Sequence, residues 1–249
     1  MSPKIQIEVS VDSVASAIAA ERGGADRVEL CSDLREGGIT PSAGLIQSVR
    51  SAVRIGVYVM IRPRAGDFCY AESEFETMRR DVEVAKRIGA DGVVLGILNA
   101  DGSVNPGLTN QLVLLARPLK VTFHRAFDMT CDLFRALEDV CVTGADRILT
   151  SGGEQTALQG VETIASLVEK ARGRIIVIPG SGIKPDNARD IVSRTGVAEV
   201  HVGLRSRAPS PMMFRNPRIR MGSAEGVEYE RFGVLEEDVR KLRVALAAE

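Results

Sequence analysis

The sequence has few aromatic residues and no tryptophan, which limits what its core can be built from. Aromatic residues make up 4% of the 249 residues, whereas hydrophobic residues make up 45% and charged residues 26%. A core this poor in aromatics must be mainly aliphatic, and this favours buried parallel strands over a β-sandwich.

The chain also lacks paired cysteines and segments that target or anchor a protein. Its four cysteines, Cys31, Cys69, Cys131 and Cys141, form no CxxC or CxC pair, so we expect free thiols in a reducing compartment. No signal-peptide pattern and no run of eighteen apolar residues is present, which predicts a cytoplasmic protein that does not bind membranes. The net charge of -1 predicts no general attraction to nucleic acid.

Several catalytic patterns are missing as well. None of the six lysines falls at an inward position near a strand end, which disfavours a Schiff-base aldolase. The sequence has no HxH or DxD pair and no Walker loop, and this weakens hydrolytic zinc and nucleotide-binding interpretations.

What the sequence does contain is a fourfold internal repeat. The pattern Gly-Ala-Asp followed by a short apolar run occurs at residues 24–31, 89–96 and 144–151, and in altered form at 196–203. Each copy follows a helix-like stretch, so the glycine is expected to end that helix in a left-handed conformation. The aspartate suits the tight turn into the next strand.

The repeat predicts a (β/α)₈ TIM barrel built from four βαβα quarters, as one domain over residues 1–249. Further apolar runs lie between the copies, at 4–9, 56–61, 119–124 and 174–178. Helices are expected near 12–22, 42–53, 73–88, 106–117, 130–143, 156–172, 184–194 and 235–247. Eight strand–helix units close into a barrel, whereas an open doubly wound sheet would leave the fourfold repeat unexplained. A long loop at 204–232, rich in arginine and proline, precedes the last helix.

Alternation along the strands predicts which side chains point into the barrel. In the first strand Ile5, Ile7 and Val9 share the outer face, which leaves Glu8 and Ser10 inside. The repeat copies place an equivalent inward layer at Glu29, Val94, Leu149 and His201. One step higher comes a layer of small residues, namely Cys31, Gly96, Ser151 and Gly203. Small residues there leave space at the mouth, where barrels bind ligands.

Five acid–base side chains fall at or near this mouth. The candidate catalytic residues are Glu8, Glu29, His124, Asp128 and His201. Both histidines of the chain fall at equivalent inward strand positions, and histidine titrates near neutrality and binds metals. The alternative is a self-neutralising ion network of Glu8 and Glu29 against Arg62, without chemistry.

An anion site is also predicted at the mouth, since guanidinium groups suit carboxylates and phosphates. Its candidate residues are Arg62, Arg64, Arg125, Ser151, Gly180, Ser181, Gly182 and Gly203. The glycine loop after the seventh strand would present backbone N–H groups at a helix N-terminus. The alternative is that strand-to-helix loops need glycine in any case.

The segments VELC at 28–31, GGITPSAG at 37–44, MIRPRAGDF at 60–68, FHRAFD at 123–128, RILTSGG at 147–153 and NARDIV at 187–192 resemble the CutC copper homeostasis family. The resemblance covers nearly the whole chain. It implies a TIM barrel, a cytoplasmic location, a homo-oligomer (often a dimer) and a role in copper handling, with no established enzyme reaction.

The resemblance also offers Cys31, in the VELC motif, as a metal ligand. Copper(I) favours thiolate and thioether ligands, yet the equivalents of Cys31 in the repeat are glycine or serine. Three functions therefore stay open. They are copper(I) binding, an enzyme acting on a small phosphorylated or carboxylated metabolite, and an inert structural oligomer.

Overall fold

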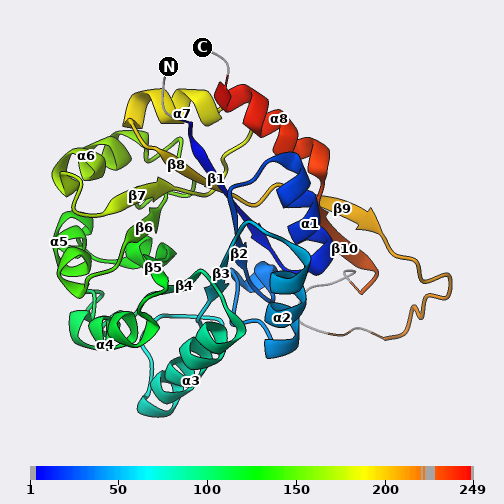
Figure 1. The fold of residues 1–249 in the computed structure, drawn as a ribbon, viewed down its shortest axis with the longest axis horizontal. Coiled ribbons are helices and arrows are strands. Elements are labelled where there is room, and N and C mark those ends of the chain that lie inside the picture. Colours follow the sequence, from blue (N-terminus) through cyan, green and yellow to red (C-terminus); the bar gives the residue numbers. More distant parts are fainter. Residues whose placement is uncertain (1–3, 220, 222–227, 248–249) are drawn as a thin grey trace.

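Eight parallel strands form a nearly closed barrel, with helices around its outside (Figure 1). The computed structural model describes residues 4–219, 221 and 228–247. The hydrogen-bonded strand order is β7-β6-β5-β4-β3-β2-β1-β8, and β8 lies beside β7. The predicted TIM barrel is confirmed, and the open doubly wound sheet is wrong.

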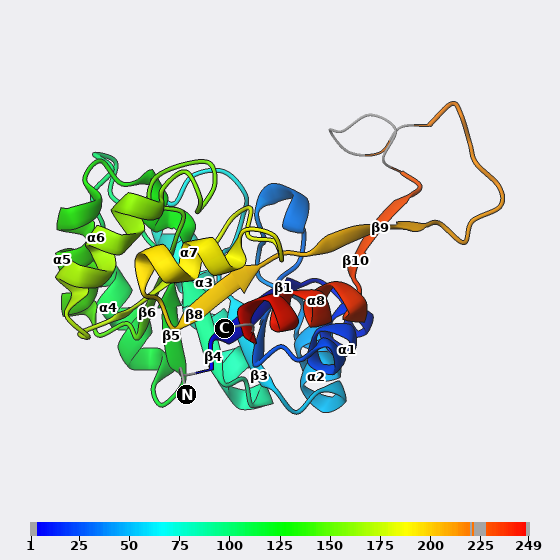
Figure 2. The same cartoon turned by 90° about the horizontal axis from the view of Figure 1, so that it is seen from above.

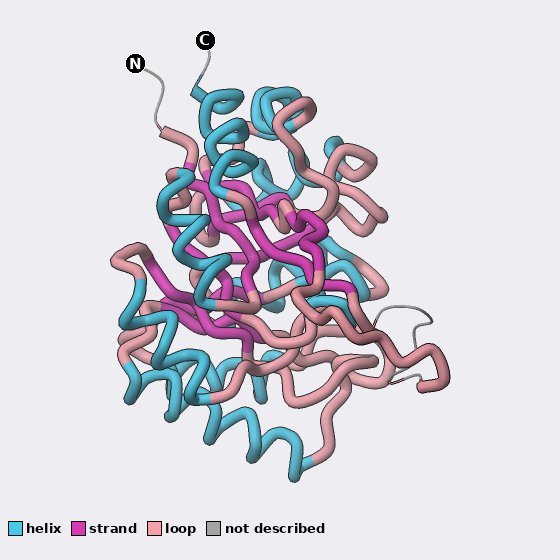
Figure 3. The backbone as a smooth tube through the Cα atoms, turned by 90° about the vertical axis from the view of Figure 1, so that its right-hand side faces the viewer, coloured by secondary structure: helices cyan, strands magenta, loops and turns pink. Residues whose placement is uncertain are grey.

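The strands are short and the helices cover them on all sides (Figure 3). The barrel strands are β1 (Gln6–Val11), β2 (Arg27–Leu30), β3 (Gly56–Met60), β4 (Gly92–Leu95), β5 (Lys120–Phe123), β6 (Arg147–Thr150), β7 (Ile176–Pro179) and β8 (Glu199–Val202). The helices are α1 (Val14–Gly23), α2 (Ala43–Ala52), α3 (Glu72–Ile88), α4 (Pro106–Ala116), α5 (Leu133–Thr143), α6 (Val161–Ala171), α7 (Ala188–Thr195) and α8 (Glu236–Ala247).

The predicted phase of the strands agrees with the packing. Val28, Val93 and Ile148 are fully buried in the large apolar cluster between the strands and the helices. Cys31 and Val94 belong to a separate small cluster inside the barrel, together with Tyr58 and Met60. The inward side chains are therefore those that alternation selected.

The aspartate of the repeat has a more specific role than shaping a turn. The carboxylates of Asp26, Asp91 and Asp146 accept the backbone N–H groups of Ile7, Val57 and Val121, at 2.8, 2.8 and 2.9 Å. Each aspartate thus joins the turn before an even strand to the preceding odd strand at the bottom of the barrel. The fourth copy has Ala198 here, and only its backbone carbonyl bonds to β1, through Gln6 N–H at 2.9 Å.

The helix after β7 begins later than the sequence predicts. Residues 184–187 form a turn in which the Asn187 side chain accepts the N–H of Lys184 at 2.8 Å. The helix α7 therefore begins at Ala188, six residues beyond Gly182. The predicted anion site at the N-terminus of this helix is wrong in that respect, because the helix does not open directly after the glycine loop.

The predicted loop at 204–232 contains two strands. The antiparallel pair β9 (Arg205–Pro209) and β10 (Glu230–Val234) extends away from the barrel (Figure 2). Its base is fixed to α1, since Val234 N–H donates to Ser16 Oγ at 3.2 Å. Beyond β9 the side chain of Met213 is 98% exposed. The predicted homo-oligomer stays a prediction.

We predict that Asp146→Ala lowers the free energy of unfolding by about 1–3 kcal/mol, because the buried N–H of Val121 loses its acceptor. The substitution also removes the partner of Arg117 and Lys120. Urea denaturation would measure the change, with Asp186→Ala, at an exposed position before α7, as the control. Similar small losses in both variants would contradict this role of the repeat aspartate.

Candidate functional site at the mouth of the barrel

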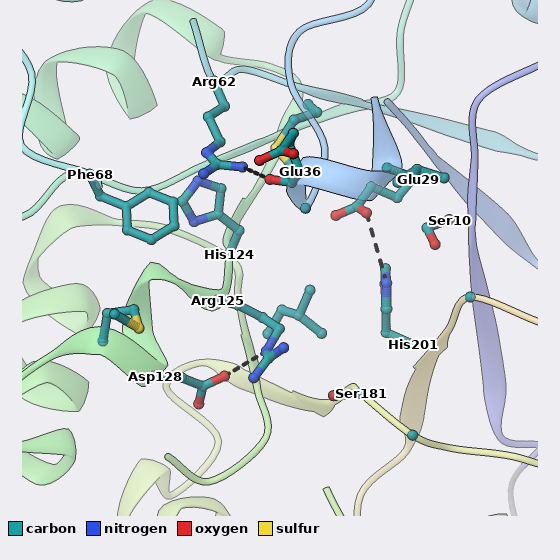
Figure 4. A pocket seen from close by; sticks show the side chains of 17 residues that line it. Ser10, Glu29, Glu36, Arg62, Phe68, His124, Arg125, Asp128, Ser181 and His201 are labelled. Atoms are coloured by element: carbon teal, nitrogen blue, oxygen red, sulfur yellow. Dashed lines mark hydrogen bonds and ion pairs between the residues drawn. The ribbon is translucent and has the colours of Figure 1, made fainter. Parts of the chain in front are cut away.

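A cavity of about 470 Å³ opens at the carboxyl ends of the strands. Its polar lining residues are Ser10, Glu29, Glu36, Arg62, His124, Arg125, Asp128, Ser181 and His201 (Figure 4). Carboxyl ends of parallel strands are where barrels bind their ligands. The mouth that alternation predicted is therefore a real cavity.

Below the cavity lies a floor of buried ion pairs. Arg27 Nε lies 2.5 Å from Glu8 Oε2, and Arg27 Nη2 lies 2.6 Å from Glu199 Oε2. Arg147 Nε reaches the same Glu199 oxygen at 3.0 Å. The ring of Tyr58 lies against both guanidinium groups, 5.3 and 5.5 Å from their central carbons. The floor thus consists of two cations shared between two carboxylates.

Sequence reasoning missed the two arginines of this floor. The expected network paired Glu8 and Glu29 with Arg62, which is wrong, because Glu8 is paired with Arg27 and His201. The sequence did contain a signal for these arginines. Arg27, Arg147 and Glu199 occupy the same position in their copies of the repeat, two residues before the inward residues of each strand. Alternation therefore placed all three inside the barrel.

His201 stands directly on this floor, between two carboxylates. Its Nδ1 lies 2.7 Å from Glu8 Oε1, and its Nε2 lies 3.8 Å from Glu29 Oε2. Burial would raise the pKa of Glu8, but Arg27 and then His201 lower it to about 2. Glu8 is therefore ionised and accepts a hydrogen bond from the Nδ1–H group of His201. The Nε2 atom is left directed at Glu29 and the cavity (Figure 4).

The pKa values of His201 and Glu29 are both raised, whereas that of Glu8 is lowered. Burial alone would lower the pKa of His201, but the carboxylates of Glu29 and Glu8 raise it above the ordinary value. The pKa of Glu29 is raised by burial, an effect that His201 opposes and Glu8 reinforces. One oxygen of Glu29, Oε1, has no hydrogen-bond partner among the described residues.

Cys31 lies beside this pair but does not line the cavity. Its thiol donates to Glu29 Oε2 at 3.5 Å, and the side chain is fully buried. Burial first, and then the charge of Glu29, raise the pKa of the thiol well above its usual range. Burial and the Glu29 carboxylate therefore both oppose deprotonation of Cys31, the predicted metal ligand.

The opposite wall carries Arg62 and His124 (Figure 4). The guanidinium donates to the carbonyl oxygens of Glu36, Gly38 and Gly66 at 2.8, 3.0 and 2.8 Å. The imidazole accepts the Ala126 N–H on Nδ1 at 3.1 Å. Burial and the nearby charge of Arg62 lower the pKa of His124 to about 3. His124 is therefore neutral and carries its proton on Nε2.

Asp128 lines the cavity but is held by several hydrogen bonds, and its catalytic role stays a prediction. It lies 2.8 Å from Arg125 Nε and accepts the N–H groups of Ser151 and Gly153 at 3.0 and 3.1 Å. The hydroxyl of Thr150 also donates to it, at 2.5 Å. These bonds occupy the carboxylate and fix the loop after β6, so Asp128 and Arg125 neutralise each other.

The structure brings together only part of the predicted anion site. Ser181, Gly182 and Gly203 line the cavity, but Arg64, Ser151 and Gly180 do not. Arg64 turns outward and pairs with Glu74 at 2.5 Å and with Asp67 at 3.1 Å. The Arg64 prediction is therefore wrong as to place. β3 ends at Met60, so strand alternation does not extend to residue 64.

One group in the described chain has the composition of a metal site. Ligand atoms of Glu8, Glu29 and His201 all lie within 4.8 Å of one another, and all three residues are buried. Cys31 is not a member of this group.

The comparisons with known proteins agree with the fold and identify the family. The family model described as CutC matches residues 5–206. A human protein named copper homeostasis protein cutC homolog is 48% identical over 237 residues, which cover 95% of this chain and 86% of that protein. The chain belongs to the CutC family.

Other members of the CutC family show the same breadth of similarity. A CutC family protein from Chromobacterium violaceum is 45% identical, covering 96% of this chain and 97% of that protein. The crystal structure of a CutC protein from Streptococcus agalactiae matches with a TM-score of 0.76 and 32% identity. That match covers 80% of this chain and 98% of the other.

More distant structural matches concern the fold alone. Thiamine phosphate pyrophosphorylase from Pyrococcus furiosus matches with a TM-score of 0.59 at 19% identity, over 98% of this chain and 96% of the other. The CutC relatives confirm the resemblance to that family, and they give no support to the enzyme alternative.

No helix in the described part of the chain has the length and apolar character that a membrane crossing requires.

We predict that Arg27→Met lowers the free energy of unfolding by about 3–5 kcal/mol, because it leaves Glu8 and Glu199 buried without their shared cation. The control is Arg240→Met on the exposed face of α8, where the pair with Glu236 is worth about 0.5 kcal/mol or less. Chemical denaturation of both variants would measure the difference. A loss for Arg27→Met no larger than for the control would contradict the role assigned to the floor.

Proposed function

We propose that this CutC-family barrel binds copper at its mouth, with His201 and Glu29 as the ligand residues. The observation that carries the proposal is the pair formed by His201 Nε2 and Glu29 Oε2, 3.8 Å apart at the cavity wall. Metal–nitrogen and metal–oxygen bonds of about 2 Å each span such a gap. The family names of the relatives support copper as the metal.

Glu8 would act by orienting His201 rather than as a ligand. Its oxygens are taken by Arg27 and by the Nδ1 side of the imidazole. A carboxylate bonded to the second nitrogen of a metal-binding histidine fixes the ring and raises its basicity. The buried floor therefore prepares His201 for a metal on the side that faces the cavity.

The donor set fits divalent copper better than copper(I). Imidazole and carboxylate ligands suit Cu²⁺, which binds a given nitrogen and oxygen site more tightly than the other divalent first-row ions. Copper(I) would need sulfur, and Cys31 is a buried thiol in one apolar cluster with Met60. All four cysteines are free thiols, which supports the cytoplasmic location that we propose for the protein.

The chain has two histidines, and this makes the proposal testable. With one equivalent of Cu²⁺, electron paramagnetic resonance is expected to show coupling to one imidazole nitrogen in the wild type and in His124→Gln. The signal should be lost, and binding weakened at least tenfold or about 1.4 kcal/mol, in His201→Gln. Coupling that survives in His201→Gln would contradict the proposed ligand.

An anaerobic titration with Cu⁺ distinguishes the proposed site from the alternative in which the sulfur of Cys31 binds Cu⁺. Under the proposal, Cu⁺ binding is micromolar or weaker and unchanged in Cys31→Ser. Tight Cu⁺ binding that Cys31→Ser abolishes would instead place the copper site at Cys31 and the neighbouring Met60.

A further inference from the structure

The wall opposite His201 holds a buried positive charge that pairs with no carboxylate in the described part of the chain. Arg62 is 6% exposed and donates hydrogen bonds to three neutral backbone carbonyls. The central carbon of its guanidinium group lies over the ring of Phe68, 4.9 Å from the ring centre. It forms no ion pair with any carboxylate of the described residues, and its Nε has no partner there within hydrogen-bond distance. The hydroxyl of Tyr70 interacts with the Arg62 side chain, but it is neutral and does not compensate the charge. A buried charge is costly unless a counter-charge accompanies it.

A second buried donor lies in the same wall. The Nε2 of His124 has no partner among residues that the structure describes, although the side chain is 4% exposed. Because Nδ1 accepts the Ala126 N–H, the proton resides on Nε2, which is therefore a donor without an acceptor. Leaving such a buried donor without an acceptor destabilises the protein, and a ligand that supplies the acceptor removes that cost.

We propose that the cavity binds a small organic carboxylate, whose charged group lies against Arg62 and His124. The two side chains supply one positive charge and unused N–H donors, which match the charge and the acceptors of one carboxylate. This site goes beyond the proposed copper site and does not depend on it.

The surroundings favour a carboxylate over a phosphate ester. Among the residues that the structure describes, Arg62 is the cation of the cavity wall without a carboxylate partner, since Arg125 is neutralised by Asp128. The helix N-terminus that commonly binds phosphate begins at Ala188, beyond the glycine loop. The apolar side chains of Met60, Phe68 and Leu149 line the same cavity and provide contact for a carbon skeleton.

Isothermal titration calorimetry on the full chain, with EDTA present to remove metal, would test the site. The probes are propanoate, L-lactate and L-malate, with propanamide as the neutral control and inorganic phosphate as the competing anion. We expect at least one carboxylate to bind with a Kd below about 10 mM, and more tightly than either control. Failure of all three carboxylates, or tighter binding of phosphate, would overturn the proposal.

Two arginines two positions apart provide matched variants. Arg62→Gln should weaken carboxylate binding at least tenfold, whereas Arg64→Gln, outside the cavity, should leave it unchanged. Equal binding by wild type and Arg62→Gln would overturn the assignment.

A measurement on the wild type covers the case in which Arg62→Gln does not fold. The ¹H–¹⁵N signals of Arg62 Nε and His124 Nε2 should both shift on saturation with the bound carboxylate. Signals that do not move while heat of binding is observed would place the carboxylate elsewhere and overturn the proposal.

Discussion

The shared burial of Arg27 between Glu8 and Glu199 is the interaction on which the rest of the site depends. A barrel interior is ordinarily apolar, and an ionised side chain there needs a partner at close range. Arg27 supplies that partner to both carboxylates, and Arg147 adds a second cation on Glu199. Glu8 therefore stays ionised at the centre of the molecule. The Glu8 oxygen that does not contact Arg27 accepts from Nδ1 of His201, and this determines which nitrogen carries the proton and which one faces the cavity.

The mouth above this floor is divided into two unlike walls. On one side His201 lies between carboxylates, which favour its protonated form and make its outer nitrogen a proton carrier or a metal ligand. On the other side His124 lies against Arg62, which together with burial keeps the imidazole neutral. The two histidines thus have opposite electrostatics. They are not at equivalent strand positions as predicted, because His201 lies within β8 whereas His124 follows the last residue of β5. The difference arises from what surrounds each ring, namely the carboxylates of Glu29 and Glu8 beside His201, and burial together with the charge of Arg62 around His124.

Much of this arrangement was predictable from the sequence, because two periodicities carried it. The four copies of the repeat marked the even strands, the apolar runs between them marked the odd strands, and alternation by two placed Glu8, Glu29 and His201 inside. Alternation failed beyond the strand ends, which is why Arg62 and Arg64 were assigned to one site although Arg64 turns outward. Glu8 and Arg27 lie on the consecutive strands β1 and β2 and are paired in register. Alternation places both inside, but it does not give the register between the strands, so their pairing was not predictable from spacing alone. Cys31 points into the barrel as predicted but does not line the cavity, and its burial and its bond to Glu29 required the packed structure.

The most direct test of this account is an NMR titration of the two histidine rings in metal-free protein, followed through their ¹⁵N shifts. The account predicts that His201 titrates above the ordinary pKa of 6.5 and loses its proton from Nε2, keeping Nδ1–H bonded to Glu8. It predicts that His124 stays neutral with its proton on Nε2 until the pH approaches about 3. If His201 titrated below 6.5, or lost the Nδ1 proton first, the claim that the buried floor orients and charges the site would be contradicted.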